Sequence, residues 1–394
     1  MENKRKKVIK KKIAIITDIG FQKKEFDRFS IGELSKEFEI YVFDFTEIIN
    51  PSLNKIVKKN QIKLKNFHEV RNFKNFEKFF LKNQFLTTIQ NMSNYEFFLK
   101  INNFFRNHSL SITFIQNSFP MEFKKNFFQK IYNAIFVLLD KKRILGKIRY
   151  LLYKKKKNTF YSSIAFVCGL KGLKHSSIGT KTKIIKSHSR EYDIHIKLKS
   201  NKKFIKNNYK YAVFLDQYLP FHTDAKLIKN FNSKVTEEKY FPAMNDFFSL
   251  FEEQTKTKVI IAAHPKADYE RNNKNFWNGR LFYKSKTYEL IQDSSYVLAH
   301  TSTAFSYAII LKKPMIFLTS DEYMKSYDNF RVHGYANYFK QPLFNIDHVK
   351  RNDLKKDLKK IDQKIYKKYF EDYIKYPGGL NIQSNKIFIN HFKN

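Results

Sequence analysis

The sequence predicts an α/β protein with two doubly wound, Rossmann-like domains. Its 394 residues are too many for one ordinary core and favour about two domains. Short apolar runs alternate with helical patterns near the N-terminus and again after residue 205, and this alternation is typical of parallel sheets. We predict an N-terminal α/β domain with basic helical insertions (1–204), a second α/β domain (205–345) and a helical C-terminal tail that can pack back on the first domain (346–394).

The composition is that of a folded cytoplasmic protein. Apolar residues make up 42% and aromatic residues 17% of the chain, enough to build sizeable cores. The single cysteine, Cys168, excludes an internal disulfide framework and suits a reducing compartment. No apolar run approaches the roughly 18 residues of a membrane span. The apolar run at 13–16 is also too short for a signal peptide.

The formal net charge of +39 predicts attraction to polyanions and anionic membranes. Three basic clusters, at residues 4–12, 141–143 and 154–157, lie in the first half of the chain, so we expect this half to face an anionic membrane. The sequence carries no zinc-finger spacing, RNP motif or basic zipper, and we therefore expect no specific nucleic-acid partner. A non-catalytic basic scaffold that binds polyanions stays open as an alternative, as does the oligomeric state.

The N-terminal region predicts a right-handed βαβ unit followed by a less regular segment. The expected elements are a strand (12–17), a helix (25–38), a strand (39–45), a mostly helical region (60–160) and strands at 111–116 and near 182–186. The first strand ends at the turn signal Asp18-Ile19-Gly20. A polar cluster from His188 to Asp193 follows the last strand, and a solvated linker is the alternative interpretation of it.

The second half alternates strictly between strands and helices. We expect a strand (209–215), a helix (243–255), a strand (258–263), a helix (286–295), a strand (296–299), a helix (303–312) and a strand (313–318). This alternation predicts a second doubly wound domain.

Polar clusters follow three of these strands. They are Asp216-Gln217, His264-Pro265-Lys266 and His300-Thr301-Ser302-Thr303. In open α/β sheets, ligands bind in the crevice beyond the carboxyl ends of the strands, so we expect the three clusters to converge on one site.

The third cluster opens a helix and predicts an anion site. Helix N-termini present unpaired N–H groups and partial positive charge, and hydroxyls add donors, so Thr301, Ser302 and Thr303 can cradle a phosphate. The alternative is helix capping, for which one hydroxyl suffices. His264 would donate a hydrogen bond to the phosphate from across the crevice, or it simply ends a strand before Pro265. Lys266 and Lys286 would add positive charge.

Several other chemistries are disfavoured. The eleven histidines show no HExxH or paired spacing and there is no cysteine cluster, so we expect no metal ion. A GxxxxGK[ST] loop and a GxSxG elbow are also missing, which disfavours nucleotide hydrolases and α/β-hydrolase esterases.

The spacing of two motifs resembles that of bacterial glycosyltransferases with the GT-B fold. A strand followed by His264-Pro265, and about 36 residues later a strand followed by Thr301-Ser302-Thr303, is similar to the group that includes sialyltransferases and the capsule and lipopolysaccharide transferases that use CMP-activated nonulosonic acids or Kdo. The resemblance covers roughly residues 209–320. It implies two Rossmann-like domains facing a central cleft, with the donor domain at 205–345 and the acceptor domain at 1–204.

The resemblance also implies roles for single residues. In those families the His-Pro motif contacts CMP and the Ser/Thr motif holds its phosphate, so the matching nucleotide contacts are His264, Pro265 and Thr301 to Thr303. The acidic residue followed by glycine that supplies the catalytic base in sialyltransferases has no clear copy here, and Asp216-Gln217 is a poor substitute. An inverting transfer needs a carboxylate to deprotonate the acceptor. Asp18 at the end of the first strand and Asp27 are the candidates, with Glu191 and Asp193 as further ones.

The predicted function is therefore a metal-independent glycosyltransferase of bacterial capsule or lipooligosaccharide synthesis. It would move a sugar from a nucleotide donor, by preference CMP-linked, to a glycan or lipid-linked acceptor at the inner face of the cytoplasmic membrane, with no cofactor besides the donor. Open alternatives on the same fold are a UDP-sugar transferase, a glycerophosphate transferase and a nucleotide-sugar epimerase.

Overall fold

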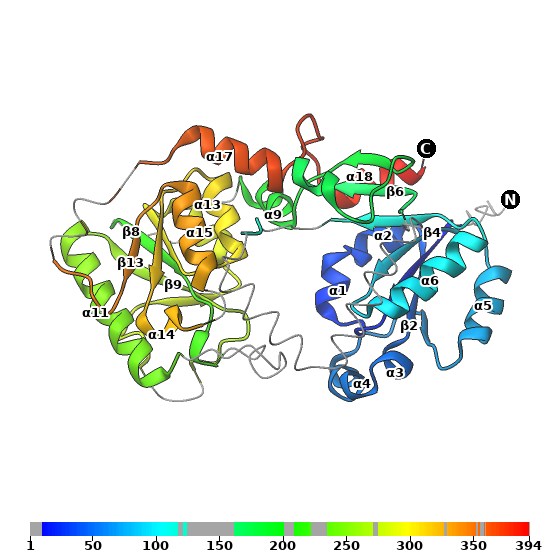
Figure 1. Cartoon of the computed structure of the whole chain (residues 1–394), viewed down its shortest axis with the longest axis horizontal. Helices are drawn as coiled ribbons and strands as arrows, with labels where there is room; N and C mark the ends of the chain where they lie inside the picture. Colours follow the sequence, from blue (N-terminus) through cyan, green and yellow to red (C-terminus); the bar gives the residue numbers. More distant parts are fainter. Residues whose placement is uncertain are drawn as a thin grey trace, which may run out of the picture. The chain divides into compact units, whose positions relative to one another are not determined.

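The computed structural model describes residues 10–116, 121–123, 161–200, 209–221, 235–270, 275–326, 329–351, 354, 358 and 360–393. The protein divides into two compact units (Figure 1). The first comprises Met1–Phe119, Val137–Arg190 and Lys375–Asn394, and the second comprises Pro120–Phe136 and Glu191–Ile374. The sequence predicted contiguous domains with boundaries after residues 204 and 345. In the structure each unit consists of separate stretches of the chain, because the last helix packs in the core of the first unit. The basic clusters at 141–143 and 154–157, and residues 4–9 of the first cluster, lie outside the described residues.

A sheet of seven parallel strands forms the centre of the first unit, in the order β3-β2-β1-β4-β5-β6-β7. The strands are β1 (Lys12–Thr17), β2 (Glu39–Asp44), β3 (Asn66–Glu69), β4 (Phe85–Asn91), β5 (Ile112–Ile115), β6 (Ile164–Val167) and β7 (Lys183–Lys186). In the register of β1 and β4, Thr17 is paired with Asn91 at the carboxyl end. The strand order reverses between β1 and β4, which makes this the topological switch point of the sheet.

Helices cover both faces of this sheet, because successive strand residues point to opposite sides. Ile13 and Ile15 of β1 pack with α1, α2 and α18, whereas Ala14 and Ile16 pack with α5 and α6 (Figure 1). The helical elements of this unit are α1 (Lys23–Arg28), α2 (Ile31–Glu37), α3 (Thr46–Ile49), α4 (Pro51–Val57), η1 (Lys58–Asn60), α5 (Phe73–Lys82), α6 (Tyr95–Asn107), η2 (Leu170–Lys174) and α18 (Ser384–Lys393). Aromatic residues of α5 and α6 lie in the core of this unit, as Phe76 and Phe104 show.

The second unit contains a parallel sheet of six strands in the order β10-β9-β8-β11-β12-β13. Its strands are β8 (Tyr211–Leu215), β9 (Lys258–Ala263), β10 (Phe282–Lys284), β11 (Tyr296–Ala299), β12 (Met315–Thr319) and β13 (Leu343–Asn345). All five pairings are parallel. Both sheets therefore have the strand order of a dinucleotide-binding fold, and the predicted pair of Rossmann-like, doubly wound domains is confirmed.

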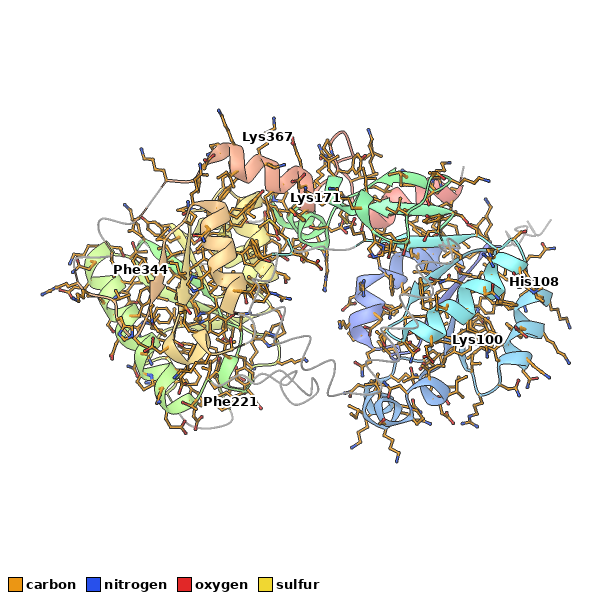
Figure 2. The ribbon with its side chains drawn as sticks, in the orientation of Figure 1. Lys100, His108, Lys171, Phe221, Phe344 and Lys367 are labelled. Atoms are coloured by element: carbon orange, nitrogen blue, oxygen red, sulfur yellow. The ribbon has the colours of Figure 1, made fainter. Side chains whose placement is uncertain are left out.

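Helices cover the six-stranded sheet, with α11 packed on β9 and α15 on β12. The helical elements are α9 (Arg190–Leu198), η3 (Leu219–Phe221), α11 (Glu237–Thr255), α12 (Thr287–Asp293), η4 (Thr303–Phe305), α13 (Ser306–Ile310), α14 (Asp321–Met324), α15 (Asn329–Phe339), α17 (Gln363–Tyr369) and the π-helical η5 (Phe370–Ile374). The only tryptophan of the chain, Trp277, lies in this core with 2% of its surface exposed. Lysine side chains project from the protein, including Lys100, Lys171 and Lys367 (Figure 2).

Several elements differ from the sequence prediction. Strands β3 and β4 lie in the region predicted to be mostly helical (60–160), and β10 and β13 were not predicted. The first helix is divided at Ser30, whose φ of 51° lies in the left-handed region and interrupts α-helical hydrogen bonding. Helix α11 begins at Glu237, six residues before the predicted start at 243, and it contains Pro242. The polar cluster after β7 contains the boundary between the two units, after Arg190, but it is only partly solvated, since His188 is buried and α9 begins at Arg190. Within the described ranges, no helix is long and apolar enough to cross a bilayer.

Replacing Phe388 with alanine should destabilise the first unit. Phe388 is 3% exposed, and its ring lies 6.2 Å from that of Phe38 and 5.2 Å from that of Phe166. Phe388→Ala should therefore lower the free energy of unfolding by about 3–5 kcal/mol, measured by urea unfolding followed by far-UV circular dichroism. The fluorescence transition of Trp277, in the other unit, should shift less. Leu380→Ala, at a site that is 56% exposed, is the control and should change stability by less than about 0.5 kcal/mol.

Candidate functional site

Polar residues gather at the carboxyl ends of three neighbouring strands of the second unit. Strand β8 lies between β9 and β11, and the strand order reverses between β8 and β11. Asp216 follows β8, His264 follows β9 and His300 follows β11. The three clusters that the sequence singled out thus lie on adjacent strands at the switch point of one sheet, where doubly wound folds bind ligands.

Asp216 is a buried carboxylate that accepts hydrogen bonds from the loops at this end of the sheet. Its Oδ1 accepts the backbone N–H of Tyr218 at 2.7 Å. Its Oδ2 accepts the backbone N–H of His264 at 3.1 Å and the hydroxyl of Tyr269 at 2.9 Å. Burial raises the pKa of the Asp216 carboxyl, and these hydrogen bonds oppose the rise. A carboxylate with three internal donors organises the site, and it does not fit the predicted direct contact with an anionic ligand.

Gln217 joins β8 to β11 beyond their last backbone pairing. Its Oε1 accepts the backbone N–H of Thr301 at 2.9 Å, and its Nε2 donates to the Thr301 carbonyl. The side-chain amide therefore extends the β8–β11 ladder into the crevice. The next residue, Tyr218, has a φ of 54°, a conformation that non-glycine residues rarely adopt and that is found disproportionately at functional sites.

The His264-Pro265 turn holds the imidazole in one orientation. The His264 carbonyl accepts the N–H of Ala267 at 2.8 Å, and Pro265 fits the second position of this turn because its φ is already set. Nδ1 of His264 accepts the backbone N–H of Lys266 at 3.2 Å. The neutral ring therefore carries its proton on Nε2, which makes Nε2 the donor atom. His264 is half-buried, whereas Pro265 and Lys266 are exposed.

His300 lies in the core beneath this edge. Its Nδ1 donates to the Leu318 carbonyl at 2.7 Å, and its Nε2 accepts the hydroxyl of Tyr240 at 2.9 Å. Desolvation lowers the pKa of His300 to about 4, although the hydrogen bond to Leu318 opposes the shift. A neutral imidazole with 0% exposure and two internal partners does not fit the predicted contact with a phosphate.

The three hydroxyls after His300 have different environments. Thr301 Oγ1 is hydrogen-bonded to the Tyr323 hydroxyl at 3.0 Å, and Ser302 Oγ accepts the N–H of Ala304 at 3.3 Å as the cap of η4. The Thr303 side chain is exposed. The expected helix is a short pair, η4 and α13, that ends at Ile310. Ser302 and Thr303 remain the accessible hydroxyls of this cluster.

The two predicted lysines are not equivalent. Lys266 is exposed in the turn beside His264. Lys286 follows β10 at the edge of the sheet, two strands away from β8, and pairs with Glu289 at 3.1 Å. Lys286 therefore lies away from the switch point of the sheet.

The predicted catalytic carboxylates of the first unit have structural roles. Asp18 is 1% exposed, and it accepts the backbone N–H groups of Ser93 and Asn94, each at 2.7 Å. Asp27 lies on the surface of α1, paired with Lys23 at 3.0 Å. Neither geometry resembles a base that is ready to accept a proton. The further candidates Glu191 and Asp193 lie in the first turn of α9.

The sequence did not identify the tyrosines that support this edge. Tyr240, Tyr269 and Tyr323 bind His300, Asp216 and Thr301 through their hydroxyls. They come from α11, a loop and α14, and no spacing in the chain marks them as one set. In the part of the chain that the structure describes, no group of three or more His, Cys, Asp or Glu residues is arranged to hold a metal ion.

No family model matches the chain, and no curated protein matches its sequence. Among solved structures, a variant of the wall teichoic acid polymerase TagF is similar with a TM-score of 0.52 and 10% identity, over 97% of this chain and 88% of that chain. The chain has a GT-B-like fold. The predicted resemblance to GT-B proteins is thus supported at the level of the fold, and the comparisons contain no pointer to CMP-sugar transferases.

Two weaker similarities have TM-scores of 0.44. One is to MurG of Acinetobacter baumannii, with 7% identity over 97% of this chain and 99% of that chain. The other is to the UDP-GlcNAc 2-epimerase of Methanocaldococcus jannaschii, with 11% identity over 97% of this chain and 100% of that chain.

The burial of His300 should make the stability of the second unit depend on pH. The folded-state pKa of about 4 lies below the unfolded value of 6.5, so the unfolded chain takes up the proton first. Burial of neutral His300 costs no stability above pH 6.5, and the free energy of unfolding decreases as the pH falls from 6.5 toward 4. Lowering the pH from about 7.5 to about 5 should cost about 2 kcal/mol through this residue, measured by urea unfolding with Trp277 fluorescence.

His300→Gln should remove this part of the pH dependence. His108→Gln, at an exposed position of the first unit, is the matched control and should unfold with the wild-type pH profile (Figure 2). Equal pH profiles for His300→Gln and wild type would contradict the assignment.

Proposed function

We propose that this protein is a glycosyltransferase that binds a nucleotide-activated donor at the carboxyl ends of β8, β9 and β11. One observation carries the proposal: three adjacent strands end in polar loops at a switch point, with an oriented histidine on one side and hydroxyls on the other. Two strand spacings separate the backbones of His264 and Thr301, about 10 Å. Phosphate groups of a nucleotide bound between these loops can therefore receive hydrogen bonds from both sides.

In this proposal the site stabilises the departing phosphate. Nε2–H of His264 donates to a phosphate oxygen, and Ser302 and Thr303 donate from the opposite loop. Donors that are fixed before the reaction stabilise developing negative charge without reorganising, which lowers the barrier to bond cleavage. The turn at Pro265 and the hydrogen bonds accepted by Asp216 keep these donors in place. Lys266 adds positive charge at the rim.

We further propose a CMP-linked donor, a nonulosonic acid or Kdo, and a glycan or lipid-linked acceptor in the synthesis of a bacterial surface polysaccharide. The support is the spacing of His264-Pro265 and Thr301 to Thr303, which resembles the motifs of CMP-sugar transferases. The net charge of +39 supports peripheral attachment to an anionic inner membrane surface.

A second candidate is a transferase of phosphodiester polymers. The fold likeness to a protein named wall teichoic acid polymerase favours it. A glycerophosphate donor would also be nucleotide-linked, and its phosphates would need the same donors from His264 and the hydroxyls. The nucleotide base and the transferred group distinguish the two candidates.

Replacing His264 should weaken nucleotide binding. Loss of a hydrogen bond to a charged phosphate costs about 1.5–3 kcal/mol, so His264→Ala should bind its nucleotide about 10–100-fold more weakly. Thermal shifts with CMP, CDP, UMP and UDP identify the preferred nucleotide, because a bound ligand stabilises the folded state. Lys286→Ala, at the edge strand, is the control and should retain wild-type affinity. Wild-type affinity of His264→Ala for all four nucleotides would refute the site.

Neutralising the N-terminal cluster should weaken membrane binding. Each basic side chain near an anionic surface contributes about 1 kcal/mol, so changing Lys4, Arg5, Lys6 and Lys7 to glutamine should reduce binding to phosphatidylserine vesicles at least about tenfold. Sedimentation with these vesicles measures the change. Changing three exposed lysines of the second unit, Lys360, Lys364 and Lys367, is the control and should have a smaller effect. Unchanged binding of the N-terminal variant would exclude this mode of attachment.

A further inference from the structure

Tyr218 has a backbone conformation that is unusual for an aromatic residue. Its φ of 54° lies in the left-handed region, where the Cβ atom crowds the backbone and which bulky residues avoid. Lys256, Lys312 and Lys340 also have positive φ, but each lies at the C-terminal end of a helix, where left-handed residues are common. Tyr218 lies instead between strand β8 and the short helix η3. It is the only aromatic residue with a positive φ in the part of the chain that the structure describes.

The Asp216 carboxylate holds Tyr218 beside the two loops assigned to phosphate binding. Oδ1 of Asp216 accepts the backbone N–H of Tyr218 at 2.7 Å, and Oδ2 accepts that of His264 at 3.1 Å. Gln217, the residue before Tyr218, is hydrogen-bonded to the backbone of Thr301. Strand β8 is the middle one of the three strands that end at the site. Tyr218 therefore lies between the loop of His264 and the loop of Thr301.

The Tyr218 ring packs against aromatic residues of the second unit. Its centroid lies 5.3 Å from that of Tyr269 at an interplanar angle of 84°, and 5.1 Å from that of Phe221 at 50°. Phe221, labelled in Figure 2, lies 6.1 Å from Phe241 and 5.8 Å from Phe276, both of which are buried. These contacts, together with the fixed backbone, limit the orientations of the Tyr218 ring.

The outer part of the Tyr218 side chain is accessible to a ligand. Tyr218 is half-buried, and its hydroxyl, which has no hydrogen-bond partner among the described residues, is not a buried atom. Within the described ranges no ring is stacked parallel on it, since its two partners are tilted by 50° and 84°. Strained residues persist only where their surroundings impose them, and they cluster at ligand-binding sites. Glycine or asparagine would adopt this backbone at lower cost, so what tyrosine adds at this position is its ring.

We propose that the Tyr218 ring stacks on the base of the nucleotide whose phosphates bind between His264 and Ser302. This inference rests on the proposed function, because it adopts the phosphate position assigned there. Tyr269 and Phe221 hold the ring, and the base lies on its outward face. The ligand is thereby narrowed to phosphates that carry an aromatic base, and sugar phosphates and lipid phosphates are disfavoured.

A fixed aromatic ring suits a base for two physical reasons. A nucleobase is flat and has weakly polar faces, so stacking removes ring surface from water without leaving a polar group unpaired. A tyrosine that is already held in place loses little side-chain freedom on binding. Stacking does not distinguish one base from another, because every base has an aromatic face. Tyr218 should therefore add affinity for cytosine and uracil nucleotides alike.

Removing the ring should weaken binding only of ligands that carry a base. CMP, UMP and ribose 5-phosphate, a matched ligand without a base, are titrated with the whole chain and followed by ligand-observed NMR. Asparagine tolerates a left-handed backbone, so Tyr218→Asn removes the ring and keeps the loop. It should bind CMP and UMP about 5–150-fold more weakly than wild type, and ribose 5-phosphate equally well. Tyr218→Phe keeps the ring and should bind all three ligands as wild type does.

Two further variants serve as controls. Tyr209 is 41% exposed and precedes β8, at the opposite end of the strand from Tyr218. Tyr209→Asn should keep the wild-type affinity for all three ligands. His264→Ala should weaken the binding of all three, because each carries the phosphate assigned to His264. Circular dichroism should show that every variant is folded.

The outcomes separate the base site from the proposed function. Nucleotide binding that requires His264 but is unchanged in Tyr218→Asn would overturn the base site and leave the donor site intact. An equal loss of CMP and ribose 5-phosphate binding in Tyr218→Asn would also overturn it, since the ring would then act on the sugar or on the phosphate loops. Wild type that binds neither nucleotide would refute both proposals. Weaker nucleotide binding in Tyr218→Asn with normal binding in His264→Ala would support the base site and refute the assigned phosphate contact.

Discussion

A buried aspartate follows the first strand of each sheet, and the two crevices depend on it. Asp18 accepts the backbone N–H groups of Ser93 and Asn94, and Asp216 accepts the backbone N–H of His264. A carboxylate taken out of water is costly unless hydrogen bonds compensate it, so each aspartate holds its neighbouring loop in one conformation. The parallel ladder ends at these residues, and side-chain hydrogen bonds replace it. The Gln217 side chain likewise replaces the backbone ladder, because its amide is hydrogen-bonded to the backbone of Thr301.

These hydrogen bonds determine which polar side chains of the second unit are oriented toward a ligand and which are held in the core. His264 is oriented by the N–H of Lys266 and is half-buried, so its Nε2–H is a donor of fixed direction. His300 has the same position on its own strand, but both of its nitrogens are bonded within the core. The difference follows from packing: Tyr240 and Leu318 enclose His300, whereas the turn at Pro265 turns the chain outward after His264.

The two switch points present different chemistry. In the second unit the accessible groups are an imidazole donor and hydroxyls, with Lys266 at the rim. In the first unit the carboxylate expected to act as a base, Asp18, is buried and hydrogen-bonded to backbone. Neutral donors suit a phosphate whose charge changes during a reaction, because they stabilise it without binding the ground state too tightly.

The amino-acid sequence by itself predicted two doubly wound α/β domains, the ends of β8, β9 and β11 and the adjacency of Asp216, His264 and Thr301, whereas it missed β3, β4, β10 and β13. It predicted those features because apolar periodicity and the residues that follow a strand are local properties. Only the tertiary structure decided that the carboxylates of Asp18 and Asp216 are hydrogen-bonded to neighbouring loops and that His300 lies in the core. These outcomes depend on which residues from distant segments, such as Tyr240 and Ser93, reach the same point, and no local pattern records that contact. The interleaved units have the same origin, since the apolar face of α18 is buried only where Phe38 and Phe166 receive it.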